Sequence, residues 1–411
     1  MTDPITPHHP KSVREVVETG LCIGCGLCEA LAPTRWRMQL THQDRLRPSP
    51  IAPEDTAADR SILNACPGAV AQAEAKGTQD DAVWGSYVSM GEAWAGDDDI
   101  RFKAATGGVL TALGVHLLKA GKAQFILHCA ADPERPMRSQ WVMSDTPEQV
   151  SARVGSRYGP TDTLAGLEHA LVRQQPFAII AKPCDAGAVR ARAKADPRLD
   201  ELLVAVLVMV CGGASDLGKS RALLDEYKLD EDDLTLFRYR GHGNPGPTRV
   251  ETKDGRAFEK TYLDLWEDES GWQLQSRCKI CPDAIGEAAD VAAADIWPGG
   301  APVGDDAGFN GIISRTPEGQ TLVDSAVAAG DLVLGQAHTP RDYDDFQPHQ
   351  VRKKRAIAAR LRGLTAAGQP VYAHHGLRID ALDAGDAAQE AGTKDRAAQG
   401  RFRDAMEQWQ T

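Results

Sequence analysis

The segment FAIIAKPCDAGAVRARAKADPRLDELLVAVLVMVC, residues 177–211, contains a strand pattern, a helix pattern and a second strand pattern in succession. FAIIA (177–181) and LLVAVLVMV (202–210) are short apolar runs of the kind that form strands. AGAVRARAKA (186–195) lies between them and mixes alanine with basic residues, as a helix does. Alternation of strand and helix in this order predicts an α/β sheet.

The same alternation extends toward the N-terminus. Thr106-Gly107-Gly108 is a glycine turn that opens an amphipathic helix running to about residue 120, and KAQFILHCA (122–130) is a strand pattern. TLAGLEHALVRQ (163–174) is a further helix pattern. We therefore expect a mixed α+β and α/β fold. It divides into a ferredoxin-like one-cluster module over 1–90, an α/β domain over 91–375 and a charged helical tail over 376–411.

Composition narrows the class of protein. The chain has 411 residues, a net charge of −12 and nine cysteines. An acidic balance disfavours nucleic acid as a partner, because phosphate backbones attract basic surfaces. The longest apolar run is about half the roughly 20 residues that span a bilayer, and the first residues carry no secretion signal. We expect a cytoplasmic protein without a membrane partner, whose cysteines are metal ligands or reactive thiols.

Three cysteines recur at two-residue intervals in LCIGCGLCEA, residues 21–30. Cys22, Cys25 and Cys28 fit the C-x2-C-x2-C run of bacterial ferredoxins, and Cys66-Pro67 supplies the Cys-Pro typical of the fourth ligand. Cys22, Cys25, Cys28 and Cys66, here the first thiol group, are predicted to bind one 4Fe–4S cluster. Zinc is the competing interpretation, although structural zinc usually takes two separate C-x2-C pairs.

A second set of cysteines follows two strand patterns and one loop. Cys184 and Cys211 come directly after the strand patterns of the opening segment, and Cys278 and Cys281 form a C-x2-C pair before Pro282. These four residues, here the second thiol group, would meet at one edge of the sheet and bind a second 4Fe–4S cluster. The alternative is that Cys184 and Cys211 are small buried apolar residues, which is the interpretation taken for Cys129.

GASDLGKS, residues 213–220, matches the phosphate-loop pattern G-x4-G-K-S between a strand and a helix. It would indicate an ATPase that also carries clusters. Asp216 would repel a triphosphate, and the loop begins beside Cys211. The competing interpretation is a glycine turn with Ser215 or Asp216 capping the next helix.

Seven motifs occur in the order expected for one known family: RFKAATGGVLTALGVHLLKAG, GSRYGPT, AKPCDAGAVRA, FRYRGHGNPGP, RCKICPDAIGEAADVAAADIWPGG, GFNGIISRTPEG and PHQVRKKRAIAARLRG. Over roughly residues 15–365 the chain resembles the coenzyme F420 hydrogenase/dehydrogenase beta-subunit family. That family also contains 7-hydroxymethyl chlorophyll a reductase and a ferredoxin-dependent divinyl chlorophyllide 8-vinyl reductase.

The resemblance implies FAD, bound without a Rossmann motif, and two 4Fe–4S clusters. The implied cofactor-binding residues are Thr106, Gly107, Gly108, Ser156, Arg157, Tyr158, Pro183, Arg240 and Asn310. Amides at the helix start after Gly108 suit a pyrophosphate. Lys182, as a cation beside anionic reduced flavin, and His242, as a proton donor, are the implied catalytic residues. The alternatives are an ordinary helix cap, surface charges at Arg157 and Lys182, and an exposed loop histidine.

The implied activity is that of an iron–sulfur flavoprotein oxidoreductase. Reduced ferredoxin would supply single electrons, and FAD would reduce a small organic substrate by hydride transfer. The alternative is an electron-relay subunit of a larger F420-type complex, and a homo-oligomer is possible. HQVRKKRAIAARLRG (349–363) carries six basic residues on one helix pattern and is proposed to dock ferredoxin; a solvated helix face is the other interpretation. The sequence leaves the substrate open between a tetrapyrrole, F420 and another acceptor.

Overall fold

The computed structural model describes residues 6–53, 55–74, 76–266, 273–302 and 306–402. A mixed eight-stranded sheet forms its centre, in the order β16-β6-β15-β14-β10-β9-β7-β8. The strands are β6 (Ser89–Ala95), β7 (Phe125–Ala131), β8 (Ser139–Ser144), β9 (Phe177–Ala181), β10 (Leu203–Met209), β14 (Val291–Asp295), β15 (Asn310–Ser314) and β16 (Leu332–Ala337). Strands β7, β9, β10 and β14 are parallel neighbours, and the other pairs are antiparallel. The predicted mixed α/β architecture is confirmed.

Side chains of the central strands alternate between two apolar layers. In β9, Phe177 and Ile179 contribute to one layer, whereas Ala178 and Ile180 pack in the other. Successive residues of a strand point to opposite faces, so a continuous apolar run is a strand covered on both sides. Helices α5 (Val109–Lys119) and α13 (Pro317–Ala328) cover one face, and the other lies against α7 (Leu167–Val172), α8 (Pro183–Ala193) and α14 (Pro340–Phe346).

The opening segment folds as β9, α8 and β10, as its pattern predicts. The expected helix before residue 120 is α5, and the helix expected at 163–174 is a 3-10 turn, η1 (Thr163–Gly166), followed by α7. The basic segment forms two helices, α15 (Pro348–Arg355) and α16 (Ile357–Ala366), because the chain bends at Ala356. The elements are therefore largely as predicted, apart from this break.

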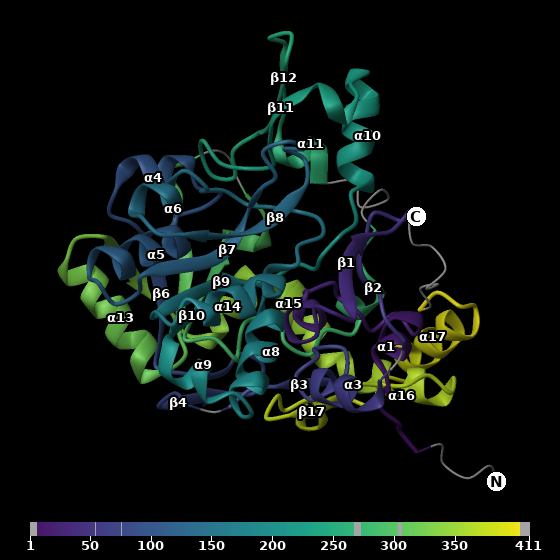
Figure 1. The fold of residues 1–411 in the computed structure, drawn as a ribbon. Coiled ribbons are helices and arrows are strands. Elements are labelled where there is room, and N and C mark those ends of the chain that lie inside the picture. The colour runs from purple at the N-terminus through teal and green to yellow at the C-terminus, as the bar shows by residue number, and fades with distance from the viewer. Residues whose placement is uncertain (1–5, 54, 75, 267–272, 303–305, 403–411) are drawn as a thin grey trace.

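The N-terminal residues and the C-terminal helices share one core (Figure 1). The N-terminal elements are α1 (Val13–Glu18), α2 (Leu27–Leu31), β1 (Trp36–Leu40), β2 (Leu46–Pro50) and α3 (Thr56–Leu63). Val16, Trp36 and Ile62 lie in the same buried group as Leu361 of α16 and Ala397 of α17 (Ala387–Ala398). The first thiol group is thus enclosed by both ends of the chain.

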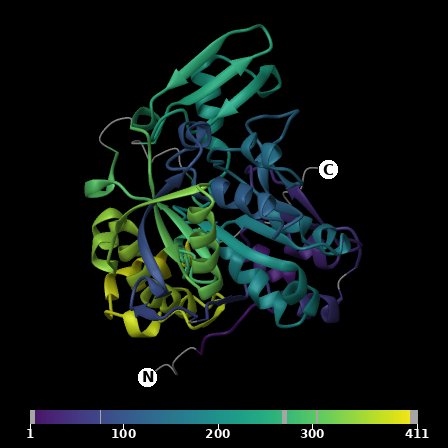
Figure 2. The ribbon, with the colours of Figure 1, turned by 90° about the vertical axis from the view of Figure 1, so that its left-hand side faces the viewer.

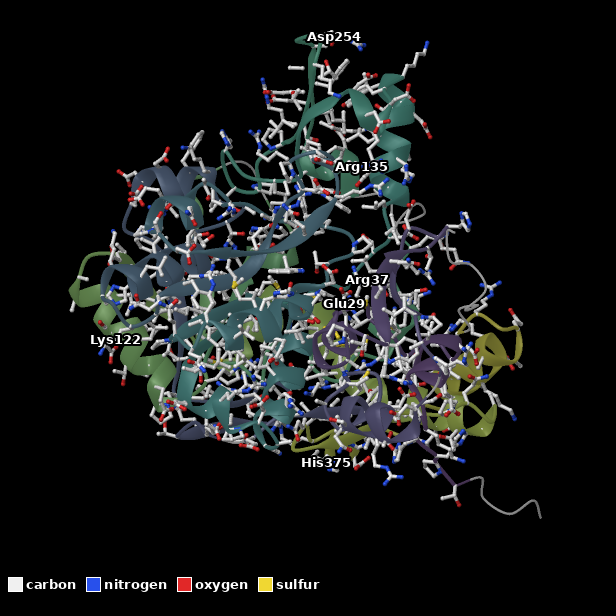
Figure 3. All side chains as sticks on the ribbon, viewed as in Figure 1. Glu29, Arg37, Lys122, Arg135, Asp254 and His375 are labelled. Atoms are coloured by element: carbon white, nitrogen blue, oxygen red, sulfur yellow. The ribbon has the colours of Figure 1, made fainter. Side chains whose placement is uncertain are left out.

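A small three-stranded sheet projects from the body, as Figures 1 and 2 show. It consists of β11 (Leu234–Arg238), β12 (Thr248–Thr252) and β13 (Ala257–Lys260), packed with α10 (Gly218–Tyr227) and α11 (Tyr262–Trp266). Asp254 marks the tip of its hairpin in Figure 3. The remaining elements are β3 (Val70–Gln72), β4 (Gln79–Asp81), β5 (Gly85–Tyr87), β17 (Ala373–His375), α4 (Asp98–Lys103), α6 (Pro147–Ser151), α9 (Pro197–Leu202), α12 (Ser276–Lys279) and the 3-10 turns η2 (Glu231–Asp233), η4 (Pro298–Gly300) and η5 (Asp380–Leu382).

The loop that carries the first three cysteines packs directly against η1. Leu164 N donates to Cys25 O at 2.9 Å. Gly26 has φ +87°, and a Cβ at this position would lie 2.6 Å from Ala165 N and 2.9 Å from Asp162 O. Only glycine fits both the backbone conformation and this close approach. Gly26 therefore sets how near the first thiol group lies to the sheet domain.

Gly26→Ala is expected to destabilise the protein by more than a left-handed backbone alone would explain. The conformational cost is about 1–2 kcal/mol, and the contact with η1 adds about 1–3 kcal/mol of overpacking. Gly255→Ala is the matched control, since Gly255 has φ +85° but nothing within 4 Å of a Cβ. Denaturant unfolding measures both changes, and equal losses in the two variants would contradict the packing role of Gly26.

Candidate functional site

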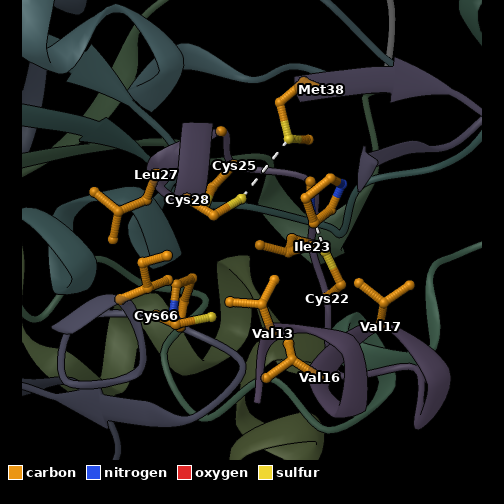
Figure 4. Close-up of a pocket in the computed structure, with 15 residues that line it drawn as sticks. Val13, Val16, Val17, Cys22, Ile23, Cys25, Leu27, Cys28, Met38 and Cys66 are labelled. Atoms are coloured by element: carbon orange, nitrogen blue, oxygen red, sulfur yellow. Dashed lines mark hydrogen bonds between the residues drawn. The ribbon is translucent and has the colours of Figure 1, made fainter. Parts of the chain in front are cut away.

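The first thiol group lines one pocket, shown in Figure 4. Cys22, Cys25 and Cys28 come from the loop before α2 and its first turn, and Cys66 approaches from the end of α3. The other lining residues are mostly apolar: Val13, Val16, Val17, Ile23, Leu27, Met38, Pro48, Ile62 and Pro67 with Gly24 and Gly26. The structure thus brings the four predicted ligands around one pocket with mostly apolar walls.

Burial governs the acidity of these thiols. It raises the pKa of Cys66 to about 12, and it raises the pKa values of Cys25 and Cys28 well above the ordinary thiol value. The negative charges of neighbouring thiolates raise them further. Buried thiols with raised pKa values lose their protons most readily to a bound cation. The donor set therefore fits a metal centre that takes thiolates.

Glu29, which follows Cys28, fixes the strand that forms one wall of this pocket. Glu29 Oε2 accepts from Met38 N at 2.6 Å, and Glu29 Oε1 lies 3.5 Å from Arg37 Nε. Figure 3 shows Glu29 and Arg37 side by side. These contacts tie strand β1 to helix α2, and Met38 Sδ thereby reaches to 4.0 Å from Cys28 Sγ. The β1–β2 hairpin is in this way a lid of the pocket.

The second thiol group gathers at the carboxyl edge of the parallel strands. Cys184 lies in the first turn of α8 after β9, and Cys211 follows β10. Cys211 N donates to Ala284 O at 2.8 Å, which joins the end of β10 to the loop after Cys281. Ala214 N donates to Cys278 Sγ at 3.2 Å. Ligand sites of open α/β sheets lie at this edge, because strand ends and loops converge there.

The four thiols of the second group influence one another. Burial raises the pKa of Cys211 to about 11, and the charges of Cys278 and Cys281 add to the effect. Burial likewise raises the pKa of Cys184. The negative charge of Asp185 is the second largest cause of this increase, and Cys281 and Cys211 contribute less. Mutual effects of this kind require the thiols to be close in space. Cys129 lies instead within β7, as expected for a strand residue.

Among the described residues, no three His, Cys, Asp or Glu side chains converge as the ligands of one ion would. The thiols of the first group line one pocket instead of meeting at a point. Such spacing is compatible with a cubane, in which each thiolate binds a different iron.

Lys182 is half-buried and lies near a cysteine of each thiol group, Cys25 and Cys184. Its Nζ donates to Thr161 Oγ1 at 2.7 Å and Thr161 O at 3.0 Å, and pairs with Asp185 Oδ2 at 2.9 Å. Burial lowers the pKa of Lys182, but Asp185 and Cys184 outweigh it, so the pKa lies above its ordinary value. Pro183 is the first residue of α8, with Lys182 as its N-cap. The ammonium is thus committed to Thr161 and Asp185.

Several of the predicted flavin-binding residues meet around Asp295, at the end of β14. Thr106 Oγ1 donates to Asp295 Oδ1, and Arg240 Nη1 donates to Asp295 Oδ2 at 2.7 Å. Arg240 Nη1 is also 3.3 Å from Tyr158 Oη, and Nη2 donates to Ala105 O at 2.8 Å. Asp295 was not among the predicted ligands, although it lies in the motif ADIW.

Aromatic rings enclose the Arg240 guanidinium. It lies 4.9 Å from the centroid of Tyr262 and 5.3 Å from that of Trp297. Burial alone would lower its pKa, but Asp295 raises the pKa above the ordinary arginine value. Sequence reasoning missed Tyr262 and Trp297, since lone aromatic residues carry no spacing signal. A fixed cation with aromatic walls suits a planar anionic ligand.

The glycine turn before α5 is present, but two of its amides are occupied. Asn310 Oδ1 accepts from Gly107 N at 3.0 Å and from Val109 N at 3.3 Å. Gly108 takes a left-handed conformation with φ +76° as the N-cap. The structure therefore brings Asn310 to this turn as a partner of its amides. Those two amides are not available to a pyrophosphate in this arrangement.

Arg157 makes structural contacts away from Asp295. Its guanidinium donates to Ser139 Oγ and to the carbonyls of Pro136, Met137, Arg138 and Phe237 at 2.6–3.1 Å. It thereby joins the turn before β8 to β11. Ser156, its neighbour, is half-buried. Since these contacts lie away from Asp295, Arg157 does not belong to the group of residues around that carboxylate.

His242 lies on an exposed loop with φ +62° and packs edge-on against Phe102, 5.2 Å between ring centroids. Burial, Arg238 and Lys103 lower its pKa. A lowered pKa leaves the imidazole mostly neutral at pH 7, and a neutral imidazole is a poor source of a proton. This geometry matches the exposed loop histidine better than a proton donor.

The G-x4-G-K-S segment is involved in other contacts. Asp216 Oδ1 accepts from Gly218 N at 2.9 Å at the start of α10, and the amide of Ala214 points to Cys278. The N-cap of α10 is Leu217, which makes no side-chain cap hydrogen bond, so Asp216 contacts the helix start without being its N-cap. The loop amides that would cradle a phosphate are thus partly used by the cysteine loop and by Asp216.

The basic segment presents only part of its charge to solvent. Arg352 and Arg355 of α15 are exposed, whereas Lys354 is 5% exposed and forms an ion pair with Glu287. Lys353 Nζ donates to Gly212 O at 3.2 Å, beside Cys211. The prediction that Lys354 contributes to a docking surface is therefore wrong, because its side chain is buried. In the described part of the chain, no helix is both long and apolar enough to cross a bilayer.

Two family models match the chain, and both describe the beta subunit of coenzyme F420 hydrogenase/dehydrogenase. Residues 90–168 match the model of its N-terminal part, and residues 175–339 match the model of its C-terminal part. Together they cover more than half of the chain. The first thiol group precedes both matched regions, and the second lies within the C-terminal one.

Named relatives and a solved structure agree with these models. A subunit of the F(420)H(2) dehydrogenase of Methanosarcina mazei is 20% identical over 321 residues, 77% of this chain and 85% of the relative. The beta subunit of the coenzyme F420 hydrogenase of Methanothermobacter thermautotrophicus is 23% identical over 261 residues, 60% and 84% of the two chains. A chain of the F420-reducing NiFe hydrogenase complex from Methanosarcina barkeri shares the fold, with a TM-score of 0.55 and 19% identity over 72% of this chain and 98% of that one.

The chain is therefore a redox protein that belongs to the coenzyme F420 hydrogenase/dehydrogenase beta-subunit family, the family that its motifs predict.

Proposed function

We propose that the chain is an iron–sulfur flavoprotein that passes electrons between a one-electron partner and a two-electron carrier. The observation that carries the proposal is the gathering of eight buried or half-buried cysteines in two groups, with the Arg240–Asp295 site at the end of β14 on the sheet edge that carries the second group. Bound 4Fe–4S clusters would supply one-electron steps, and FAD would join these to two-electron chemistry. The eight cysteines are the proposed ligands.

The residues around Asp295 are suited to hold an anionic ring system. Arg240 supplies a fixed positive charge, and Asp295 and Ala105 O orient its guanidinium. Tyr158, Tyr262 and Trp297 supply apolar walls that exclude water from the charge. We propose these residues as the flavin site, with Thr106, Gly108 and Asn310 at its floor.

The family favours a relay subunit over a self-contained reductase. Both named relatives are subunits of a dehydrogenase or a hydrogenase. We therefore propose a further subunit as partner and F420 as the first acceptor to test. With the chain alone, reduced ferredoxin should leave F420 unreduced if a partner subunit is required. Turnover with ferredoxin alone would favour the self-contained reductase instead.

One observation keeps ferredoxin as the second candidate for the electron donor. The first thiol group lies outside the residues that match the family models, so the chain carries its own additional thiol site. The exposed Arg352 and Arg355 of α15 lie next to Lys353, which contacts the second thiol group's loop. A basic surface near a cluster site suits an acidic electron carrier.

Replacement of single cysteines tests the ligand sets. Cys66→Ser and Cys211→Ser should each lose the iron of one cluster and keep the other, because each residue belongs to a different thiol group. Cys129→Ser should keep all of the iron, since Cys129 lies in β7 outside both groups. Iron and acid-labile sulfide are measured after anaerobic purification. Full iron in both ligand variants would contradict the assignment.

Charge reversal tests the ferredoxin surface. Arg352→Glu together with Arg355→Glu should lower kcat/KM for reduced ferredoxin by about tenfold at low salt, through lost electrostatic steering, and should flatten the salt dependence. Lys122→Glu together with Arg135→Glu changes the net charge equally at exposed positions elsewhere (Figure 3). Equal effects of the two double variants would reject a docking surface on α15.

A further inference from the structure

One buried cation contacts residues next to both thiol groups. Arg277 is 3% exposed and precedes Cys278 of the second group. Its Nε and Nη2 donate to Pro67 O at 3.0 and 2.8 Å, and Pro67 follows Cys66 of the first group. Its Nη1 donates to Ile280 O at 3.2 Å, directly before Cys281. The side chain therefore spans from one cysteine loop to the other.

The position of Arg277 is fixed from several sides. The guanidinium lies 4.2 Å from the ring centroid of Tyr372, and Tyr372 Oη donates to the same carbonyl of Ile280 at 2.7 Å. In the part of the chain that the structure describes, the ion pairs do not include Arg277. Its charge is met by carbonyl oxygens and a ring face, and these leave the positive charge uncompensated.

Arg157 is a second arginine whose guanidinium is bound by carbonyl oxygens, but in the described part of the chain it contacts no residue next to a cysteine of either thiol group. It joins only the turn before β8 and β11. Arg277 differs in its surroundings. Its guanidinium donates to the carbonyl directly after Cys66 and to the carbonyl directly before Cys281, so a fixed positive charge lies beside a ligand of each thiol group.

We propose that Arg277 is an electrostatic bridge that raises the reduction potentials of the two thiol-bound clusters together. The inference rests on the proposed function and adds a positioning residue to it. A positive charge in a dry interior stabilises the more negative, reduced form of each neighbouring centre. Because one charge lies beside both thiol groups, its loss would shift both potentials in the same direction.

Bound clusters would supply one-electron transfer, and Arg277 would keep its proton throughout because arginine does not titrate in proteins. The hydrogen bonds from Arg277 to Pro67 O also fix how far apart the two loops lie.

The test is a redox titration of the full chain, purified without oxygen and followed by electron paramagnetic resonance. Arg277→Met should shift the midpoint potentials of both clusters to more negative values. At a given potential we expect about a tenfold change in the reduced-to-oxidised ratio, or about 59 mV for one electron. Arg277→Lys should restore most of the shift, because it keeps the charge. Unchanged potentials in Arg277→Met, or a shift in one cluster only, would overturn the proposal.

Lys279→Met is the matched control. Lys279 carries the same charge and directly follows Cys278, but it is exposed, so solvent weakens its effect and its variant should shift both potentials much less than Arg277→Met. A shift as large as that of Arg277→Met would show that any nearby charge has the effect, and would overturn the bridge.

If Arg277→Met does not retain both clusters, Arg277→Gln is the second neutral variant to titrate. If a neutral variant retains only one cluster, a wild-type potential of that cluster would contradict the proposal. If both neutral variants lose all of their iron, full iron in Arg277→Lys would support the need for a positive charge at this position. Loss of iron in Arg277→Lys as well would overturn the proposal. Failure of the proposed function is distinct, since the wild-type chain would then lack the two cluster signals altogether.

Discussion

Burial of cysteine thiols is the constraint on which the structure depends. A thiol in a dry pocket is neutral near pH 7, and burial raises the pKa of Cys66 to about 12 and that of Cys211 to about 11. Several neutral thiols around one space contribute little packing, whereas thiolates bound to iron compensate the loss of water. The apolar walls, the hairpin held by Glu29 and the close contact at Gly26 are all consistent with a centre that must be kept dry.

The sheet supplies the frame for this arrangement. Parallel strands place all of their carboxyl ends at one edge of the sheet. Lys182 follows β9 at this edge, the loop that contains Cys211 follows β10, and β14 ends there at Asp295. The second thiol group and the Arg240 site thus lie at the same edge of the sheet, although their residues are far apart in the sequence. The N-terminal and C-terminal segments close over the other side of the first thiol group in a common core. The order of the strands in the sheet thus decides where the second thiol group and the Arg240–Asp295 site lie.

The sequence predicted strands and thiol groups well, because both depend on local patterns. Apolar runs mark β9 and β10, and the C-x2-C-x2-C spacing marks a loop that groups thiols. Other features depend on tertiary contacts. Nothing local shows that Lys354 turns inward to Glu287, that Arg157 binds carbonyls across the chain, or that Asn310 occupies the amides of the glycine turn. Tyr262 and Trp297 enclose Arg240 from distant positions, so no spacing signal could reveal them.

The central claim is that thiolate-bound iron and a flavin occupy one chain. It is tested most directly by the visible spectrum of protein purified without oxygen, together with its iron, sulfide and flavin content. The account predicts a brown protein that bleaches on reduction, with the iron of two 4Fe–4S clusters and a yellow chromophore released on denaturation. A colourless preparation, or one that holds zinc and no flavin, would contradict it.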